Sequence, residues 1–170
     1  LALWILSALY STAESYVIKD SQWLWGLFIL ITNHFADTLS IIEDCAFSGC
    51  KNLVSIALPE SLFTIGNYVF EGCISLASIT LPVSVSTIGD SIFDGCTSLA
   101  LVNLPDSITH IGNETFCRCT ALTSIIIPYY VRTIGNYAFF ECSKLASITF
   151  SPSSITSIGY SCFAGCPSLK

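Results

Sequence analysis

A unit of 23 residues recurs along most of this chain, and this repeat limits the possible folds more than any other feature. Each unit carries a Phe and, three residues later, a Cys. The positions are Phe47, Phe70, Phe93, Phe116, Phe139 and Phe163 for Phe, and Cys50, Cys73, Cys96, Cys119, Cys142 and Cys166 for Cys. One extra residue falls near Ser151. Because a single unit of this length cannot bury its own apolar side chains, the units must stack.

Within a unit, the pattern predicts a short strand, a turn, a second extended stretch and one helical turn. Residues 55–58 alternate as a strand does, and Pro59 ends the pairing because it has no N–H. Gly66 permits a tight bend, and Asn67 can cap a helical turn that carries Phe70. The sequence thus predicts a right-handed solenoid of short parallel strands and helical turns, in which the six Phe and six periodic Cys are buried. Its strands are expected near 55–58, 78–81, 101–104, 124–127 and 147–150.

The pattern Leu-x-x-Ile-x-Leu-Pro-x-x-Val-x-x-Ile-Gly-x-x-x-Phe-x-x-Cys resembles the BspA-like class of leucine-rich repeats. The resemblance covers residues 42–170, as five complete units and a truncated sixth. It implies a curved parallel solenoid of the leucine-rich-repeat type. It also implies a secreted or cell-surface protein of microbes that adheres to host matrix, host cells or other microbes. The resemblance carries over no binding residue.

The first 41 residues depart from the repeat and admit two interpretations. Residues 18–23 echo residues 88–93, which favours a degenerate N-terminal repeat that acts as a cap. Residues 1–10 are more apolar and precede small residues at 11–13, as in a segment derived from a signal peptide. The chain has no Met and stops at Lys170 within a repeat, so we interpret it as a fragment. A truncated end of this kind is expected to self-associate through its unpaired strand edge.

The composition argues against three classes of partner. Although 52% of the residues are hydrophobic, the longest apolar stretch, residues 23–32, has roughly half of the ~20 residues that a membrane-spanning helix needs. The net charge is −6, and the six Lys and Arg form no cluster. A nucleic-acid backbone or an anionic lipid surface would therefore find little to bind.

The nine cysteines fit a structural role better than a chemical one. Each of the six periodic cysteines takes the same place in its coil, and neighbouring coils lie about 4.8 Å apart, so they form a ladder of small apolar residues. Disulfides between them are possible but not expected. Cys45, Cys117 and Cys162 are irregular, and no spacing matches a zinc site. Because Cys117 takes the position of Glu71 and Asp94 in neighbouring units, we expect it to be exposed and reactive.

The sequence shows no catalytic residue set and no cofactor motif. His34 and His110 are the two histidines, and His110 takes a position that other units fill with Thr or Ser, expected to face solvent. A Gly-x-Ser-x-Gly elbow, a phosphate loop and a dinucleotide fingerprint are all absent from the sequence. We therefore expect a protein that is not an enzyme and that holds neither metal nor cofactor. Residues 113–115 form a glycosylation sequon, which makes Asn113 a candidate glycan site.

Outward-facing strand residues suggest where a partner would bind. The expected outward pairs are Ser55/Ala57, Ser78/Thr80, Leu101/Asn103, Ser124/Ile126 and Ser147/Thr149. Most are small and uncharged, and the departures define a candidate binding patch: Leu101, Asn103, Ser124, Ile126, Tyr129 and Tyr130. Exposed aromatic residues are enriched at interaction hot spots, which favours contact with a protein or glycoprotein. Two alternatives remain, namely drift on a tolerant surface and a spacer solenoid that presents another domain without binding anything itself.

Overall fold

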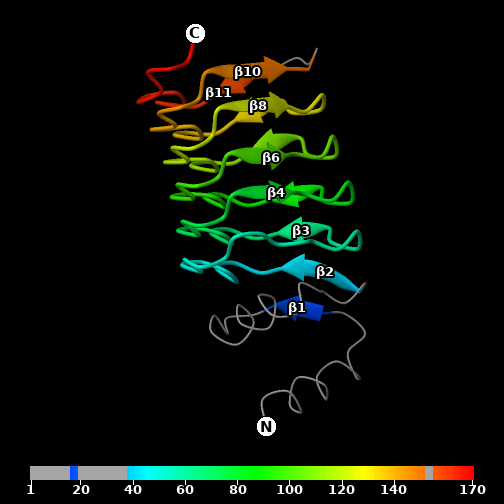
Figure 1. Cartoon of the computed structure of the whole chain (residues 1–170). Coiled ribbons are helices and arrows are strands. Elements are labelled where there is room, and N and C mark those ends of the chain that lie inside the picture. The colour runs from blue at the N-terminus through cyan, green and yellow to red at the C-terminus, as the bar shows by residue number, and fades with distance from the viewer. Residues whose placement is uncertain (1–15, 19–37, 152–154) are drawn as a thin grey trace.

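Each repeat unit forms one coil of a solenoid, and the coils follow one another along a single axis from β2 to β10 (Figure 1). The computed structural model describes residues 16–18, 38–151 and 155–170. Every strand pair within these residues is parallel. The predicted parallel solenoid is thus confirmed.

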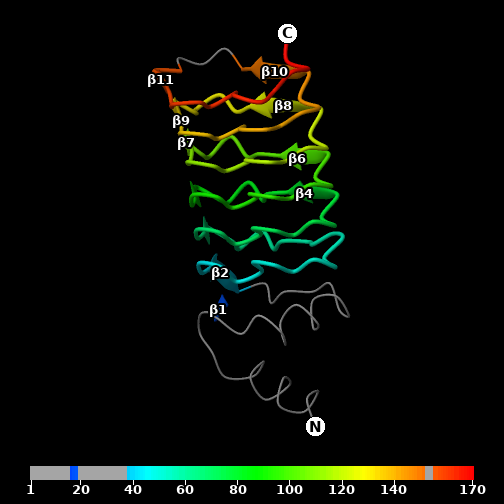
Figure 2. The same cartoon turned by 90° about the vertical axis from the view of Figure 1, so that its left-hand side faces the viewer.

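The strands form two rows on separate sides of the stack (Figure 2). The first row holds β4 (Ser78–Thr80), β6 (Leu101–Asn103), β8 (Ser124–Ile127) and β10 (Ser147–Phe150). The second row holds β1 (Tyr16–Ile18), β2 (Leu39–Ile42), β3 (Thr64–Ile65), β5 (Thr87–Ile88), β7 (His110–Ile111), β9 (Thr133–Ile134) and β11 (Ser157–Ile158). The second row corresponds to the second extended stretch that the sequence predicts.

Of the first 37 residues, the structure describes only residues 16–18. These residues form β1, which pairs with β2 and places Ile18 opposite Ile42. Residues 1–15 and 19–37, which carry most of the predicted cap or signal-derived segment, lie outside the described residues.

The repeat sets the register of the sheets, because equivalent residues of successive coils lie opposite each other. Ser78 of β4 pairs with Leu101 of β6, and Ser124 of β8 pairs with Ser147 of β10. Four of the five predicted first-row strands are confirmed, but the strand expected near 55–58 does not form. Pairing in the first row is also interrupted between β6 and β8, which belong to separate sheets.

The centre of the solenoid is a continuous stack of the periodic Phe rings. From Phe47 to Phe139 the rings are fully buried, with centroids of neighbouring rings 5.2–5.7 Å apart and ring planes within 16° of parallel. Phe163 continues the stack at 5.6 Å but is half-buried, because it lies in the last coil and contacts only the coil before it. Each ring thus packs against its counterparts in neighbouring coils, as the repeat requires.

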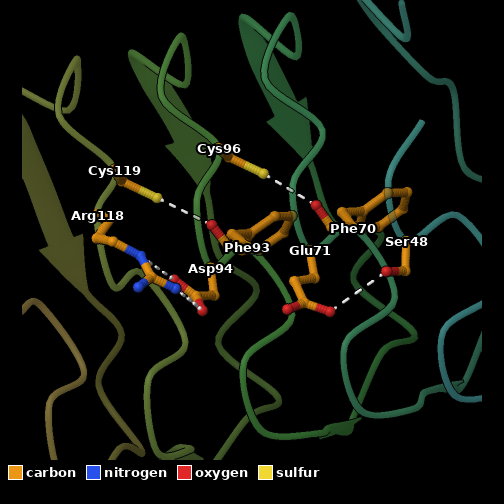
Figure 3. Close-up of polar contacts among 8 residues, drawn as sticks. All are labelled: Ser48, Phe70, Glu71, Phe93, Asp94, Cys96, Arg118 and Cys119. Carbon is orange, nitrogen blue, oxygen red and sulfur yellow. Dashed lines mark hydrogen bonds and ion pairs between the residues drawn. The ribbon is translucent and has the colours of Figure 1, made fainter. Parts of the chain in front are cut away.

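The periodic cysteines form the predicted ladder, and five of the thiols also donate to a carbonyl oxygen of the preceding coil. Sγ of Cys96 donates to the carbonyl oxygen of Phe70 at 3.1 Å, and Sγ of Cys119 donates to that of Phe93 at 3.2 Å (Figure 3). Cys73, Cys142 and Cys166 donate in the same way to the carbonyl oxygens of Phe47, Phe116 and Phe139 in the preceding coil. The prediction of burial is wrong for Cys50 and Cys166, which are half-buried.

The segments around the Phe residues are runs of turns, so the predicted helical turns are wrong. The N–H groups of Tyr68, Phe70 and Gly72 donate to carbonyl oxygens of the next coil at 2.7–2.9 Å. The intervening N–H of Glu71 donates to the carbonyl of Tyr68, three residues back, at 3.2 Å, as in a turn. Because alternate N–H groups bond to another coil, consecutive helical hydrogen bonds cannot form.

The recurring Gly is required by close packing between coils, and not by the tight bend that the sequence suggested. A Cβ on Gly66 would lie 2.4 Å from Oδ1 of Asp44 and 2.6 Å from its backbone nitrogen. The left-handed conformation belongs instead to Tyr68, whose φ is 57°. The side chains of Asn67 and its counterparts do not cap a helix but link the coils: Oδ1 of Asn67 accepts from the backbone N–H of Asp90 at 2.8 Å.

Replacing Gly89 by Ala should therefore destabilise the protein more than replacing Gly95 by Ala. A Cβ on Gly89 would lie 2.5 Å from the carbonyl carbon of Gly66, so two coils must separate, which costs about 1–3 kcal/mol or more. Gly95 has a φ of 71°, and a Cβ added there would meet no atom closer than 3.8 Å, so its Ala variant bears only backbone strain of about 1–2 kcal/mol. Urea unfolding of both variants measures the difference. Equal stabilities would show that the coils are not held this closely.

Candidate functional site

The candidate patch lies where the sequence places it, on neighbouring coils of the first strand row. Leu101 and Asn103 lie on β6, Ser124 and Ile126 lie on β8, and all four side chains are exposed. The exposed fractions are 55% for Leu101 and 64% for Ile126. By contrast, the outward residues of β4 are the small polar Ser78 and Thr80.

A groove of about 230 Å³ separates β6 from β8, at the interruption of their pairing. The four strand residues of the patch line it, together with Asp106, Pro128 and Ser151. A second groove, of about 300 Å³, lies between residues 55–58 and β4 and is lined by Ser55, Ala57, Ser78 and Thr80. Of these two grooves, only the groove within the patch is lined by exposed branched apolar side chains.

Two tyrosines border the patch just beyond Pro128. Tyr129 and Tyr130 are 47% and 53% exposed, and their rings meet edge to face with centroids 5.0 Å apart. The backbone N–H of Tyr129 donates to Oδ1 of Asp106 at 3.5 Å, and Nη1 of Arg132 donates to the carbonyl of Tyr129 at 3.2 Å. These contacts hold the backbone of the pair while leaving both rings largely accessible.

Tyr130 replaces a residue that has a structural role in the preceding coils. Oγ of Ser61 donates to the carbonyl of Leu39 at 2.7 Å, and Oγ of Ser84 donates to that of Leu62 at 2.6 Å. Ser107 makes the equivalent contact with the carbonyl of Val85. In the next coil, Tyr130 takes the position of these serines and presents an exposed aromatic ring in place of the hydroxyl.

The predicted exposure of Cys117 is wrong, because the side chain is only 5% exposed. Its counterpart Asp94 is buried as well, and it is held by Arg118 through Nε at 3.1 Å and Nη2 at 2.5 Å (Figure 3). In the earlier coils, Glu71 accepts from Oγ of Ser48 at 3.2 Å (Figure 3). Burial and the nearby Asp94 carboxylate raise the pKa of Cys117 to about 12. A thiol in this state is a poor nucleophile, so the predicted reactivity of Cys117 is not supported. The acidic residue Asp94 at the equivalent position is itself buried and therefore did not indicate exposure.

Asn113 belongs to the row of Asn and Asp side chains that links the coils. Its Nδ2 donates to Oδ2 of Asp90 at 3.1 Å, and its Oδ1 accepts from the N–H of Asn136 at 2.9 Å. Thr115, the third residue of the sequon, is fully buried and donates to the carbonyl of Gly112. A glycan on Nδ2 of Asn113 would disturb these contacts, so glycosylation of the folded chain stays a prediction with the local geometry against it.

His110 is half-buried on β7, in the row that carries Thr87 and Thr133 in neighbouring coils. His34 lies outside the described residues. Within residues 38–151 and 155–170, no group of three or more His, Cys, Asp or Glu side chains is arranged to hold a metal ion. Nor does this part of the chain contain a helix with the length and apolarity needed to span a membrane.

Comparison with known families agrees with the repeat geometry. Residues 29–120, more than half of the chain, match the family described as BspA type leucine rich repeat region, with six copies. The chain belongs to the BspA-type leucine-rich repeat family. Membership of this family indicates a repeat module for protein interaction or for structural support. No curated protein matches the chain.

Solved structures of leucine-rich repeat proteins share the fold. A protein from Bacteroides ovatus is 38% identical, with a TM-score of 0.69 over 74% of this chain and 32% of its own. The leucine-rich repeat protein of T. pallidum is 27% identical, with a TM-score of 0.70 over 93% of this chain and 78% of its own. A leucine-rich cell surface protein from Faecalibacterium prausnitzii, at 24% identity and a TM-score of 0.66, shows the fold alone over 94% of this chain and 47% of its own. The chain thus spans about a third of the length of the Bacteroides ovatus protein.

Proposed function

We propose that this BspA-type solenoid is a non-catalytic protein-interaction module that mediates adhesion of a secreted or cell-surface protein. The observation that carries the proposal is the patch of Leu101, Asn103, Ser124, Ile126, Tyr129 and Tyr130, in which Leu101 and Ile126 line a groove and two exposed tyrosines follow Pro128. On β4, in the preceding coil, the outward residues are the small polar Ser78 and Thr80. The adhesive role and the surface location rest on the repeat family. In the same proposal residues 1–41 form a cap or a signal-derived segment, and residues 42–170 form the solenoid.

The patch suits a weak contact that becomes effective in many copies. Burying the side chain of Ile126 contributes at most about 1.5–3 kcal/mol before the cost of ordering is subtracted. The two tyrosines add apolar area and hydroxyl groups that orient a partner. Several copies on one surface would strengthen such a contact through avidity without any new contact.

The double change Ile126→Ser with Tyr129→Ser should abolish binding to a protein partner and leave the melting temperature nearly unchanged, because both side chains are largely exposed. The measurement is binding of the chain to immobilised extracellular-matrix proteins, followed by surface plasmon resonance. Val83→Ser with Tyr160→Ser is the matched control, since these side chains are 79% and 72% exposed but lie outside the patch.

Binding that survives the double change would show that the patch is not the binding site and that its residues reflect sequence drift on a tolerant surface. If the chain binds none of the matrix proteins, the result favours the alternative function, a spacer solenoid that presents another domain.

A further inference from the structure

The groove within the patch carries the negative charge of Asp106. Arg132 donates to the carbonyl oxygen of the neighbouring Tyr129 at 3.2 Å but forms no ion pair with Asp106. Asp106 lines this groove and is exposed, and none of the described residues that line it is basic. Within the described residues the one ion pair joins Arg118 to Asp94, so no Lys or Arg pairs with Asp106. The carboxylate is therefore available to a positively charged partner.

The two tyrosines lie beside this carboxylate. Asp106 and Tyr129 take equivalent positions in neighbouring coils, and the N–H of Tyr129 approaches Oδ1 of Asp106 to 3.5 Å. The ring of Tyr129 meets that of Tyr130 edge to face, which leaves exposed ring surface on both. Aromatic ring faces attract cations, and guanidinium groups stack on them most readily. A cation held by Asp106 would thus find aromatic surface next to it.

We propose that the patch binds an extended protein segment in which an aliphatic side chain is flanked by Arg or Lys. The aliphatic side chain occupies the groove between Leu101 and Ile126, and the cation pairs with Asp106 beside the rings of Tyr129 and Tyr130. This inference rests on the proposed function, because it names the partner of the same patch. The net charge of −6 favours the approach of such a segment as well.

The second groove of the strand row provides a comparison within the molecule. It also carries a carboxylate, that of Glu60, and its volume of about 300 Å³ is similar. Its exposed rim consists of Ser55, Ala57, Ser78 and Thr80, with no branched apolar or aromatic side chain. Of the two grooves, only the first combines a carboxylate with exposed branched apolar side chains and has Tyr129 in hydrogen-bond contact with that carboxylate, so we expect the segment to bind there.

The test uses the whole chain and three end-blocked fluorescent peptides of equal length. Each contains leucines, with Arg, Gln or Glu at the flanking positions, and binding is followed by fluorescence polarisation. We expect the Arg peptide to bind best and the Glu peptide worst. Asp106→Asn should lower the affinity for the Arg peptide by about two- to fivefold, as expected for an exposed ion pair, and leave the affinity for the Gln peptide unchanged. Glu60→Gln should change the affinity for neither peptide. Added salt should lower the affinity for the Arg peptide more than that for the Gln peptide.

Several outcomes would overturn the inference. Equal affinities for the Arg and Glu peptides, or an Asp106→Asn variant that keeps the preference, would show that charge plays no part. If Ile126→Ser with Tyr129→Ser then abolishes binding of all three peptides, the proposed function survives without this specificity. Absence of binding by every peptide also rejects the inference, and the matrix-protein experiment then decides the proposed function separately.

Discussion

Replacing Phe93 by Ala is expected to lower the free energy of unfolding by about 3–5 kcal/mol. The ring is fully buried and stacks between Phe70 and Phe116, with centroids 5.7 Å and 5.5 Å away. Its loss removes buried apolar surface and leaves a cavity between the two neighbouring coils. Urea unfolding followed by circular dichroism measures the change.

Phe63→Ala is the matched control, because this ring is 55% exposed and takes no part in the stack. It should change the free energy of unfolding by less than about 1 kcal/mol. If both variants lose the same stability, the stack is not the main source of cohesion between coils.

Raising the pH above 9 is expected to destabilise the protein steeply. Burial raises the pKa of Cys96 and of Cys142 from the ordinary thiol value of 9.0 to about 12, and the pKa of the fully buried Cys119 lies well above that ordinary value. Between pH 9 and pH 12 the unfolded chain releases these thiol protons while the folded chain keeps them. Stability from these groups is therefore complete below pH 9 and is lost as the pH rises towards 12, by about 1.4 kcal/mol per pH unit for each such thiol.

The experiment compares urea unfolding at several pH values for the natural sequence and for Cys96→Ala with Cys142→Ala. The variant starts less stable, because the thiol contacts are lost, but its stability should fall less steeply with pH. Labelling of the folded protein with a thiol reagent near pH 8 should spare the buried Cys96, Cys117 and Cys142 and modify the half-buried Cys50 and Cys166 first. A slope that is the same in both proteins would contradict a role for the buried thiols in alkaline unfolding.

Much of the fold follows from spacing alone. Because 23 residues separate equivalent positions, parallel stacking places Phe on Phe and Cys on Cys, and alternation within a strand then fixes which side chains face solvent. That reasoning is enough to locate the core and to predict the exposure of Leu101 and Ile126, which the structure confirms. It depends only on period and hydrophobicity, which a single sequence displays.

Features that depend on contacts between coils could not be read from one unit. The sequence makes a short helix near Phe70 plausible, but hydrogen bonds to the next coil take alternate N–H groups and leave a run of turns. Gly66 suggested a bend, and the requirement is instead the close approach of Asp44 from the preceding coil. Local propensity is a weak guide here, since each backbone group has a competing partner in the neighbouring coil.

Charge at one position was also a poor guide to burial at its counterpart. Glu71 and Asp94 suggested an exposed Cys117, yet the buried Asp94 is neutralised by Arg118, and Cys117 is enclosed beside them. The sequence by itself determined the coil, its stacking and the outward direction of the patch, because these depend on period and hydrophobic pattern. Only the tertiary structure decided where strand pairing stops and a groove opens beside Asp106, because pairing depends on how two coils approach each other and not on the composition of either.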